Sequence, residues 1–243
     1  MRRCFGVALA SLALASAAGA QAMPGQFTVT PRGGVLLFDD AASIETGGAL
    51  GIDAEYHFTR FFSIGTNLTY AQASTRGEDF IGRLTYGTVA TGDTSFFFEL
   101  TQPISIVDAS LNGNLRFPTG RLAPFLTGGV GVYTLFLDPQ VTRGDTRIAR
   151  MSANVGGGLA LQLGERAGVT LDVRDLIFTD YNRERLRPAG GRFQNYQFPT
   201  EFPTAPAPKS TVHNFMISLG FMYAPRFGGS GRDVPDDTPE GGQ

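Results

Sequence analysis

The sequence predicts an all-β protein, an eight-stranded antiparallel transmembrane up-and-down β-barrel. Residues 214–223 alternate strictly, with large apolar side chains at Phe215, Ile217, Leu219, Phe221 and Tyr223 and mostly small or polar ones between them. A similar segment recurs seven more times, and each covers the ~9–11 residues that a tilted strand needs to cross a membrane. The connections alternate between tight turns and long loops, which is typical of outer-membrane barrels.

The expected strands occupy residues 26–38, 47–58, 62–73, 103–117, 121–137, 150–164, 168–178 and 211–223. Tight turns are expected at 59–61, 118–120 and 165–167, and longer segments at 39–46, 74–102, 138–149 and 179–210. In outer-membrane barrels the short turns face the periplasm and the long loops face outward. Both ends of the barrel domain are therefore expected in the periplasm.

Residues expected to face outward are sorted by depth. Beside the tight turns they are almost all aromatic: Phe27, Phe58, Phe62, Phe117 and Tyr223, with Tyr56 and Phe221 one step further in. Midway across they are aliphatic: Leu50, Ile52, Val107, Leu111, Val155, Leu159 and Val173. Aromatic rings favour the headgroup level of a bilayer, so this sorting favours a membrane wall. The alternative is a water-soluble barrel or sandwich whose apolar face points inward.

The first residues have the features of a secretory signal peptide. Arg2 and Arg3 precede an apolar run of small residues, and A-x-A cleavage motifs end at Ala20 and Ala22. The run is too short for a spanning helix, and no later stretch approaches ~20 continuous apolar residues. We expect a cleaved signal peptide at 1–22, the barrel at 23–227, a flexible periplasmic tail at 228–243, and a location in the outer membrane of a Gram-negative bacterium.

Cysteine usage and charge exclude several functions. Cys4 is the only cysteine and lies in the expected signal peptide, so the mature chain has no thiol for a disulfide, a metal or nucleophilic catalysis. The net charge of −2 becomes about −4 when Arg2 and Arg3 leave, which gives no basic face for nucleic acid. We expect no cofactor, no metal ion and no nucleic-acid partner.

Four segments carry a resemblance to a known family: APFLTGGVGVYTL (123–135), NVGGGLALQL (154–163), VTLDVRDLIF (169–178) and FMISLGFMY (215–223). They resemble the small eight-stranded outer-membrane barrels related to the transmembrane domain of outer membrane protein A. The resemblance implies the architecture and says little about activity. Two departures are expected: no peptidoglycan-binding domain follows the barrel, and the chain does not end on the aromatic residue of its last strand. The barrel-assembly machinery would then read its signal internally, from 215 to 223.

The inward faces are expected to be charged. Strand parity places three guanidiniums, four carboxylates and one imidazole in the lumen: Arg32, Asp53, Glu55, His57, Asp108, Arg116, Asp172 and Arg174. An eight-stranded barrel is just wide enough to be filled by side chains, so this near-balanced set favours a salt-bridged plug over an open channel. Hairpin symmetry about residues 42 and 43 places Arg32 opposite Asp53 and predicts an ion pair. Four inward glycines, Gly129, Gly131, Gly156 and Gly158, could make room for long side chains such as Arg174, or could permit the barrel to bend and coil.

Two groups of residues have the chemistry of a catalytic site. Asp53, Glu55 and His57 share one face, and such groups can perform general acid–base chemistry, but a plugged lumen gives a substrate no route. A lipid A-modifying hydrolase would instead need outward residues near the external boundary, where His213 and Asp175 are expected, yet no serine lies with them. We therefore expect no enzyme and no catalytic residues, with the lipid hydrolase and a small-solute channel as alternatives.

The long external segments are expected to carry function. Segment 179–210 holds four arginines, Arg183, Arg185, Arg187 and Arg192, whose guanidiniums suit lipopolysaccharide phosphates, with simple solvated charge as the alternative. The apolar stretch SFFFEL at 95–100 could extend the strands above the membrane or form an adhesive patch. The expected role is envelope integrity or surface interaction, with outer-membrane lipid, lipopolysaccharide and the barrel-assembly machinery as partners.

Overall fold

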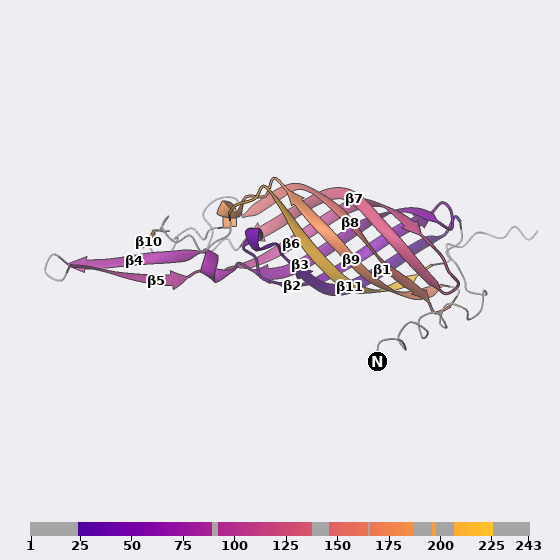
Figure 1. Cartoon of the computed structure of the whole chain (residues 1–243), viewed down its shortest axis with the longest axis horizontal. Coiled ribbons are helices and arrows are strands. Elements are labelled where there is room, and N and C mark those ends of the chain that lie inside the picture. Colours follow the sequence, from indigo (N-terminus) through magenta and orange to yellow (C-terminus); the bar gives the residue numbers. More distant parts are fainter. Residues whose placement is uncertain are drawn as a thin grey trace, which may run out of the picture.

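The computed structural model describes residues 24–88, 92–137, 146–164, 166–186, 196–197 and 207–225. Eight antiparallel strands follow one another around a closed barrel, and the first strand pairs with the last. The strands are β1 (Phe27–Leu37), β2 (Gly47–His57), β3 (Phe62–Ser74), β6 (Pro103–Arg116), β7 (Leu122–Leu137), β8 (Arg147–Gln162), β9 (Ala167–Thr179) and β11 (Thr211–Tyr223). Figure 1 shows that these strands are tilted relative to the long axis of the barrel. The predicted eight-stranded fold is confirmed, and every strand boundary agrees with the expected one to within three residues.

Within the described residues, no helix is both long enough and apolar enough to cross a membrane. Short 3-10 segments occur instead in the connections: η2 (Asp40–Ala42), η3 (Gly77–Asp79) and η4 (Arg183–Leu186). They lie at the end of the barrel that carries the long connections, which we call the loop end. The opposite end is called the tight-turn end.

The segment from 75 to 102 contains structure that the sequence analysis did not assign. β4 (Ile81–Thr88) and β5 (Gly92–Glu99) form a hairpin, and β10 (Tyr196–Gln197) joins β4 to give a three-stranded sheet. Figure 1 shows this sheet projecting beyond the loop end. The apolar stretch 95–100 therefore does not extend the barrel strands, because β3 ends at Ser74 and β5 pairs with β4 rather than with the barrel.

The outer face of the barrel follows the predicted parity. Along β11 exposed and buried residues alternate at all thirteen positions, and Leu50, Leu111 and Val155 are each more than half exposed. The aromatic residues expected beside the tight turns are also exposed, except Phe27, which is partly buried. An apolar outer face of this kind is unsuited to water. The wall therefore faces lipid, and the water-soluble alternative is wrong for this part of the barrel.

Side-chain hydrogen bonds and one glycine shape two of the tight turns. In the turn between β2 and β3, Thr59 Oγ1 accepts from the backbone N–H groups of Phe61 and Phe62 at 3.1 and 3.0 Å. Between β6 and β7, Gly120 has a φ of +68°, a left-handed conformation that glycine adopts without strain. These local devices reverse the chain over a few residues and place neighbouring strands in register.

The barrel interior has two distinct regions, of which the sequence analysis predicted one. Toward the loop end it is filled by an apolar group that we call the loop-end core. Its strand residues are Leu36, Ala49, Ala71, Ile104, Ile106, Tyr133, Leu135, Leu137, Ile148, Leu176, Phe178, Val212 and Met216, and its connection residues are Ala41, Ala42, Ile44, Phe80, Tyr181 and Leu186. The expectation of a polar lumen throughout is therefore wrong at this end.

The loop-end core is closely packed and has few polar contacts. The rings of Tyr133 and Phe178 are stacked, with centroids 4.1 Å apart and planes 10° apart. Tyr181 covers the core from a connection, and its hydroxyl donates to the carbonyl oxygen of Ala42 at 2.6 Å. Burial raises the pKa of Tyr181, so its phenol stays protonated and remains a donor. The core thus closes the lumen with uncharged groups.

Candidate functional site

The middle of the lumen contains a ring of four charged side chains, which we call the central ring: Arg32, Asp53, Asp172 and Arg174. Arg174 contacts both oxygens of Asp53 at 3.3 Å, and its Nε lies 2.6 Å from Asp172 Oδ2. Arg32 contacts Asp172 at 3.2 Å and Asp53 at 3.5 Å. All four side chains are buried, and each guanidinium touches both carboxylates. The charges therefore balance within the ring.

The strand register behind this ring differs from the predicted one. Arg32 pairs across β1 and β2 with Gly51, and Asp53 pairs with Thr30, so Arg32 and Asp53 are diagonal rather than opposite. The hairpin centre lies about one residue earlier than expected, where Asp39 caps η2 and Ser43 adopts a left-handed φ of 56°. Long side chains still reach diagonal neighbours in a sheet, which explains why the two residues touch.

Small residues make room for the guanidiniums. A Cβ at Gly51 would lie 2.8 Å from Arg32 Nε, and one at Gly156 would lie 2.8 Å from Arg174 Cγ. Such distances are too short for real contacts. At Gly51 a shift of the Arg32 side chain could relieve the contact, whereas a Cβ at Gly156 would also lie 2.4 Å from the backbone oxygen of Val173 on the neighbouring strand. Gly156 therefore leaves room both for Arg174 and for the close approach of β9, and the role of Gly51 was not anticipated.

Neutral polar groups complete the central ring. Arg32 Nη2 donates to Thr69 Oγ1 at 2.9 Å, Thr69 donates to Asn67 at 3.0 Å, and Asn67 Nδ2 donates to Asp53 at 2.8 Å. Sequence reasoning overlooked Asn67 and Thr69 because it considered only ionisable residues. Their inward parity on β3 was the available signal, since it is the same parity that places the charged residues in the lumen.

A second charged group lies nearer the tight-turn end. Arg116 Nη2 lies 2.8 Å from Glu55 Oε2, and Ser63 Oγ donates to the same oxygen at 3.0 Å. His57 is completely buried, with Nε2 at 3.0 Å from Thr28 Oγ1 and 4.0 Å from Glu55 Oε2. His57 is thus a hydrogen-bonded lumen residue.

Asp108 stands apart from the other predicted lumen residues. It is buried, and Ser152 Oγ donates to its Oδ2 at 2.5 Å. It forms no ion pair with a basic residue in the described part of the chain, and its other oxygen has no hydrogen-bond partner there. The eight residues predicted for the lumen therefore lie inside the barrel but divide into the central ring, the Glu55 group and this single carboxylate.

The geometry does not favour acid–base chemistry in the lumen. Asp53 and Glu55 are both held by guanidiniums, and His57 has no exposed surface. A general acid or base must reach its substrate within hydrogen-bonding distance, and buried groups packed among other side chains do not.

His213 and Asp175, which the sequence places on the outer face, contact each other near the loop end. His213 Nδ1 lies 2.7 Å from Asp175 Oδ2, and about half of the His213 side chain is exposed. Strand pairing places Ile177 opposite His213 and Phe215 opposite Asp175, so the cross-strand neighbours provide no nucleophile. The pair alone has the base and the orienting acid of a hydrolytic site but not its serine.

Two of the four candidate lipopolysaccharide-binding arginines lie in the described part of the chain. Arg183 and Arg185 belong to η4 at the loop end, and Arg185 is exposed. Arg187 and Arg192 lie outside the described residues, as do the predicted signal peptide and the predicted tail.

Comparison with known proteins agrees with this architecture. A family model described as the outer membrane protein beta-barrel domain matches residues 6–224. The chain belongs to this family. It is therefore an outer-membrane β-barrel protein of the bacterial envelope. No curated protein matches the chain.

Several solved structures resemble this outer-membrane barrel. Neisserial surface protein A is similar with a TM-score of 0.50 and 10% identity, over 81% of this chain and 96% of that chain. The outer membrane protein OprG from Pseudomonas aeruginosa has a TM-score of 0.45 and 15% identity, over 85% and 99% of the two chains. The N-terminal β-barrel domain of OprF from Pseudomonas aeruginosa has a TM-score of 0.40 and 12% identity, over 83% and 98%. At these identities only the fold is shared.

Proposed function

We propose that this protein is a non-enzymatic outer-membrane barrel with a closed lumen, which supports envelope integrity or surface interaction through its loop end. The observation that carries the proposal is the filling of the lumen by two successive layers. The central ring pairs its charges internally, and the loop-end core adds an apolar layer beyond it. A protein without a conducting lumen acts through its surfaces, and loops carry function in such scaffolds.

The two layers argue against the small-solute channel. An ion would have to compete with the short contacts within the central ring and then cross an apolar layer, where an unpaired charge is strongly disfavoured. We therefore expect no steady conductance from the purified protein in planar bilayers. Large, stable current steps from the wild type would replace this proposal with the channel.

The loop end offers two kinds of surface. The β4–β5 hairpin projects beyond the barrel, and Phe96 and Phe97 are each more than half exposed on it. The arginines of η4 lie at the same end, and guanidiniums suit phosphate groups geometrically. We propose outer-membrane lipid and lipopolysaccharide as the ligands of this end, and the barrel-assembly machinery as the partner during insertion.

Lipopolysaccharide binding can be tested in nanodiscs. Arg183→Gln combined with Arg185→Gln should weaken lipopolysaccharide binding several-fold at low salt, and added salt should reduce the difference because exposed charges are screened. Arg60→Gln at the tight-turn end is the matched control and should leave binding unchanged. Equal affinity of the double variant and the wild type would contradict the proposal.

The lipid A-modifying hydrolase is retained as a second candidate because His213 and Asp175 form a 2.7 Å contact on the outer face. We expect no release of fatty acid from lipid A by the purified protein. Hydrolysis by the wild type that His213→Ala abolishes would establish the enzyme instead. Activity that survives in the variant would point to a contaminant.

A further inference from the structure

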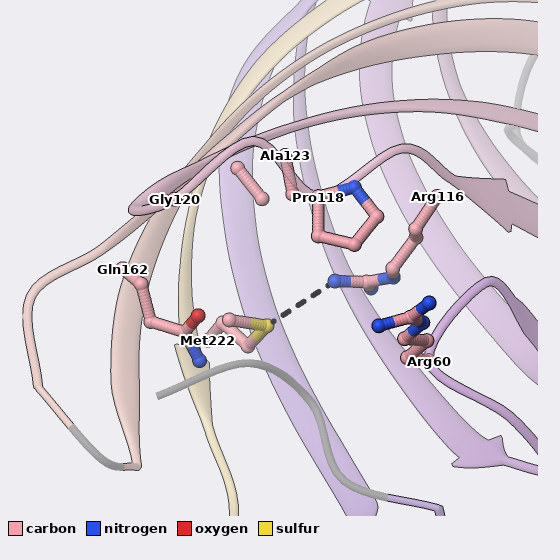
Figure 2. Close-up of a pocket in the computed structure, with 8 residues that line it drawn as sticks. Arg60, Arg116, Pro118, Gly120, Ala123, Gln162 and Met222 are labelled. Atoms are coloured by element: carbon pink, nitrogen blue, oxygen red, sulfur yellow. Dashed lines mark hydrogen bonds between the residues drawn. The ribbon is translucent and has the colours of Figure 1, made fainter. Parts of the chain in front are cut away.

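The tight-turn end of the lumen has a small hollow between strand ends and turns. Figure 2 shows it, with Arg60, Arg116, Gln162 and Met222 among the lining residues. Its volume is about 20 Å³, which is room for a group the size of one water molecule or one phosphate oxygen. Arg116 and Met222 occupy inward positions of β6 and β11, so the hollow belongs to the lumen and not to the lipid-facing wall.

Arg116 reaches this hollow with unused hydrogen-bond donors. The residue is 7% exposed, and the one strong hydrogen bond of its guanidinium joins Nη2 to Glu55 Oε2 at 2.8 Å. Its Nη1 donates to the thioether sulfur of Met222 at 3.6 Å, a weak acceptor, and its Nε has no partner in the described part of the chain. A buried guanidinium with unsatisfied donors favours a further oxygen acceptor.

Arg60 brings a second guanidinium to the hollow. It lies in the turn between β2 and β3, and this turn is held against β6 because the Arg116 N–H donates to the carbonyl oxygen of Phe61 at 2.7 Å. The Arg60 guanidinium lies over the Phe61 ring, 4.5 Å from its centroid, and forms no ion pair with an acidic residue in the described ranges. Because Arg60 is exposed, the hollow meets the surrounding water at this side chain.

The charges around the hollow favour an anion. Glu55 compensates one of the two guanidiniums, and none of the described residues that line the hollow carries a carboxylate. The other two tight turns add Arg121 and Arg166, against which the sequence of these turns places one acid, Glu165. Gln162 lines the hollow as well, and its side-chain amide is a further donor.

We propose that this hollow binds a small soluble oxyanion of the phosphate class, with one oxygen held inside by Arg116 and the others contacted by Arg60 at the mouth. Guanidinium N–H groups match the oxygens of a phosphate geometrically. Two guanidiniums also favour a ligand with more than one negative charge over a singly charged carboxylate. The site lies at the opposite end of the barrel from the surface proposed for lipopolysaccharide and is independent of that role.

Calorimetric titration of inorganic phosphate into the folded protein in a neutral detergent tests the proposal. We expect saturable binding at one site per chain, and weaker binding of acetate. Arg60→Gln should weaken phosphate binding about fivefold, because it removes one charge-assisted contact. The matched control is Arg121→Gln, which removes an exposed arginine from the next tight turn, outside the lining of the hollow, and should leave the affinity unchanged.

Filling the hollow separates this site from a general attraction of anions to the basic turns. Ala160→Val enlarges a side chain that lines the hollow and leaves every charge in place, so it should weaken phosphate binding at least as much as Arg60→Gln. A difference in gel migration between unboiled and boiled protein shows that each variant is folded. Absence of saturable binding, or equal affinity of the wild type, Arg60→Gln and Ala160→Val, would overturn the proposal.

Nanodiscs distinguish a soluble anion from a lipid headgroup as the source of the phosphate. The ratio of phosphate affinities between wild type and Arg60→Gln should be the same in phosphatidylcholine and phosphatidylglycerol nanodiscs, because a soluble ligand enters from the water beyond the turns. The surface charge of the bilayer acts on both proteins alike and cancels in this ratio. A ratio that falls to one in phosphatidylglycerol would assign the hollow to an anionic headgroup and overturn the soluble ligand.

Discussion

The central ring and the loop-end core occupy inward-facing positions of the same strands, yet one is ionic and the other apolar. On β11 the inward residues Ser218 and Gly220 face the polar region, whereas Met216 and Val212 belong to the loop-end core and flank the buried amide of Asn214, which donates to the Leu176 carbonyl oxygen. The outward residues change in the opposite direction. They stay apolar from Phe221 to Phe215 and become polar at His213 and Thr211, at the loop end. Polarity therefore inverts along a single strand.

The inversion follows from the medium outside the wall. Where lipid surrounds the barrel, apolar side chains are stable outside and the interior can hold balanced charge. Where strands extend beyond the lipid, water is outside, and apolar burial inside again becomes favourable. Gln72 on β3 and Arg147 on β8 are outward polar residues near the loop end and fit this explanation. The side chains that fill each part of the lumen therefore depend on whether lipid or water surrounds that part of the wall.

The largest expected effect concerns the loop-end core. Phe178→Ala should destabilise the barrel by about 3–5 kcal/mol, because it leaves a cavity beside the stacked Tyr133 ring. Urea unfolding in lipid measures the loss. The matched control is Phe136→Ala, which removes an exposed ring from the outer face of β7 and should cost much less. An equal loss of stability in the two variants would mean that Phe178 is no better packed than an exposed ring, and would contradict a packed loop-end core.

The central ring should respond as a coupled set of charges. Asp53→Ala and Arg174→Ala should each cost about 3–5 kcal/mol, because the partner charge stays buried, while the double variant should cost less than their sum. The structure predicts stronger coupling of Asp53 to Arg174, which reaches both carboxylate oxygens, than to Arg32 at 3.5 Å. Double-mutant cycles by urea unfolding compare the two pairs, and coupling near zero for both would contradict the ring.

The inversion itself can be tested on the outer face. Leu111→Arg should cost about 2–4 kcal/mol if the residue faces the bilayer midplane, whereas Gln72→Arg near the loop end should cost about 0–1 kcal/mol. Unfolding in lipid vesicles measures both. Similar costs at the two sites would mean that Leu111 and Gln72 lie at the same depth in the membrane. That result would contradict the inversion of polarity along the wall.

The smallest effect concerns the cap above the lumen. Asp39 accepts from the Ala41 N–H at 2.9 Å and lies 3.1 Å from Lys209 Nζ. Partial burial opposes ionisation, but the Ala41 and Lys209 contacts prevail and hold the pKa of Asp39 below its usual value. Its stabilisation is therefore complete above the usual aspartate pKa of about 4 and is lost as pH falls through the lowered value. Asp39→Ala should cost about 1 kcal/mol at pH 7.

The pH dependence supplies the control for this last prediction. The stability difference between wild type and Asp39→Ala should shrink as the pH is lowered below about 4, because both proteins then lack the carboxylate. Asp40→Ala, which removes an exposed ion pair with Arg76, should change stability little at either pH. A difference that persists at low pH would assign the effect to packing rather than charge.

The number of barrel strands, their boundaries and the residues that face inward could be predicted from the sequence, whereas the three-stranded sheet of β4, β5 and β10 could not. Local physics encodes these features, since the two-residue repeat of a strand and the turn residues are readable in one dimension. Arg32, Asp53, Asp172 and Arg174 were placed in the lumen by parity alone, and all four are buried there. The family resemblance supported the barrel architecture and the location in the outer membrane.

Tertiary structure alone decided which of these residues touch and where the interior changes character. The β1–β2 register depends on the capped turn at η2, so the expected opposition of Arg32 and Asp53 became a diagonal contact, and Arg174 from the far side of the barrel took the closer position. The loop-end core unites Leu36, Ile104 and Phe178 with residues of three connections. Such contacts arise from barrel closure and strand stagger, which bring distant segments together and which no local pattern records.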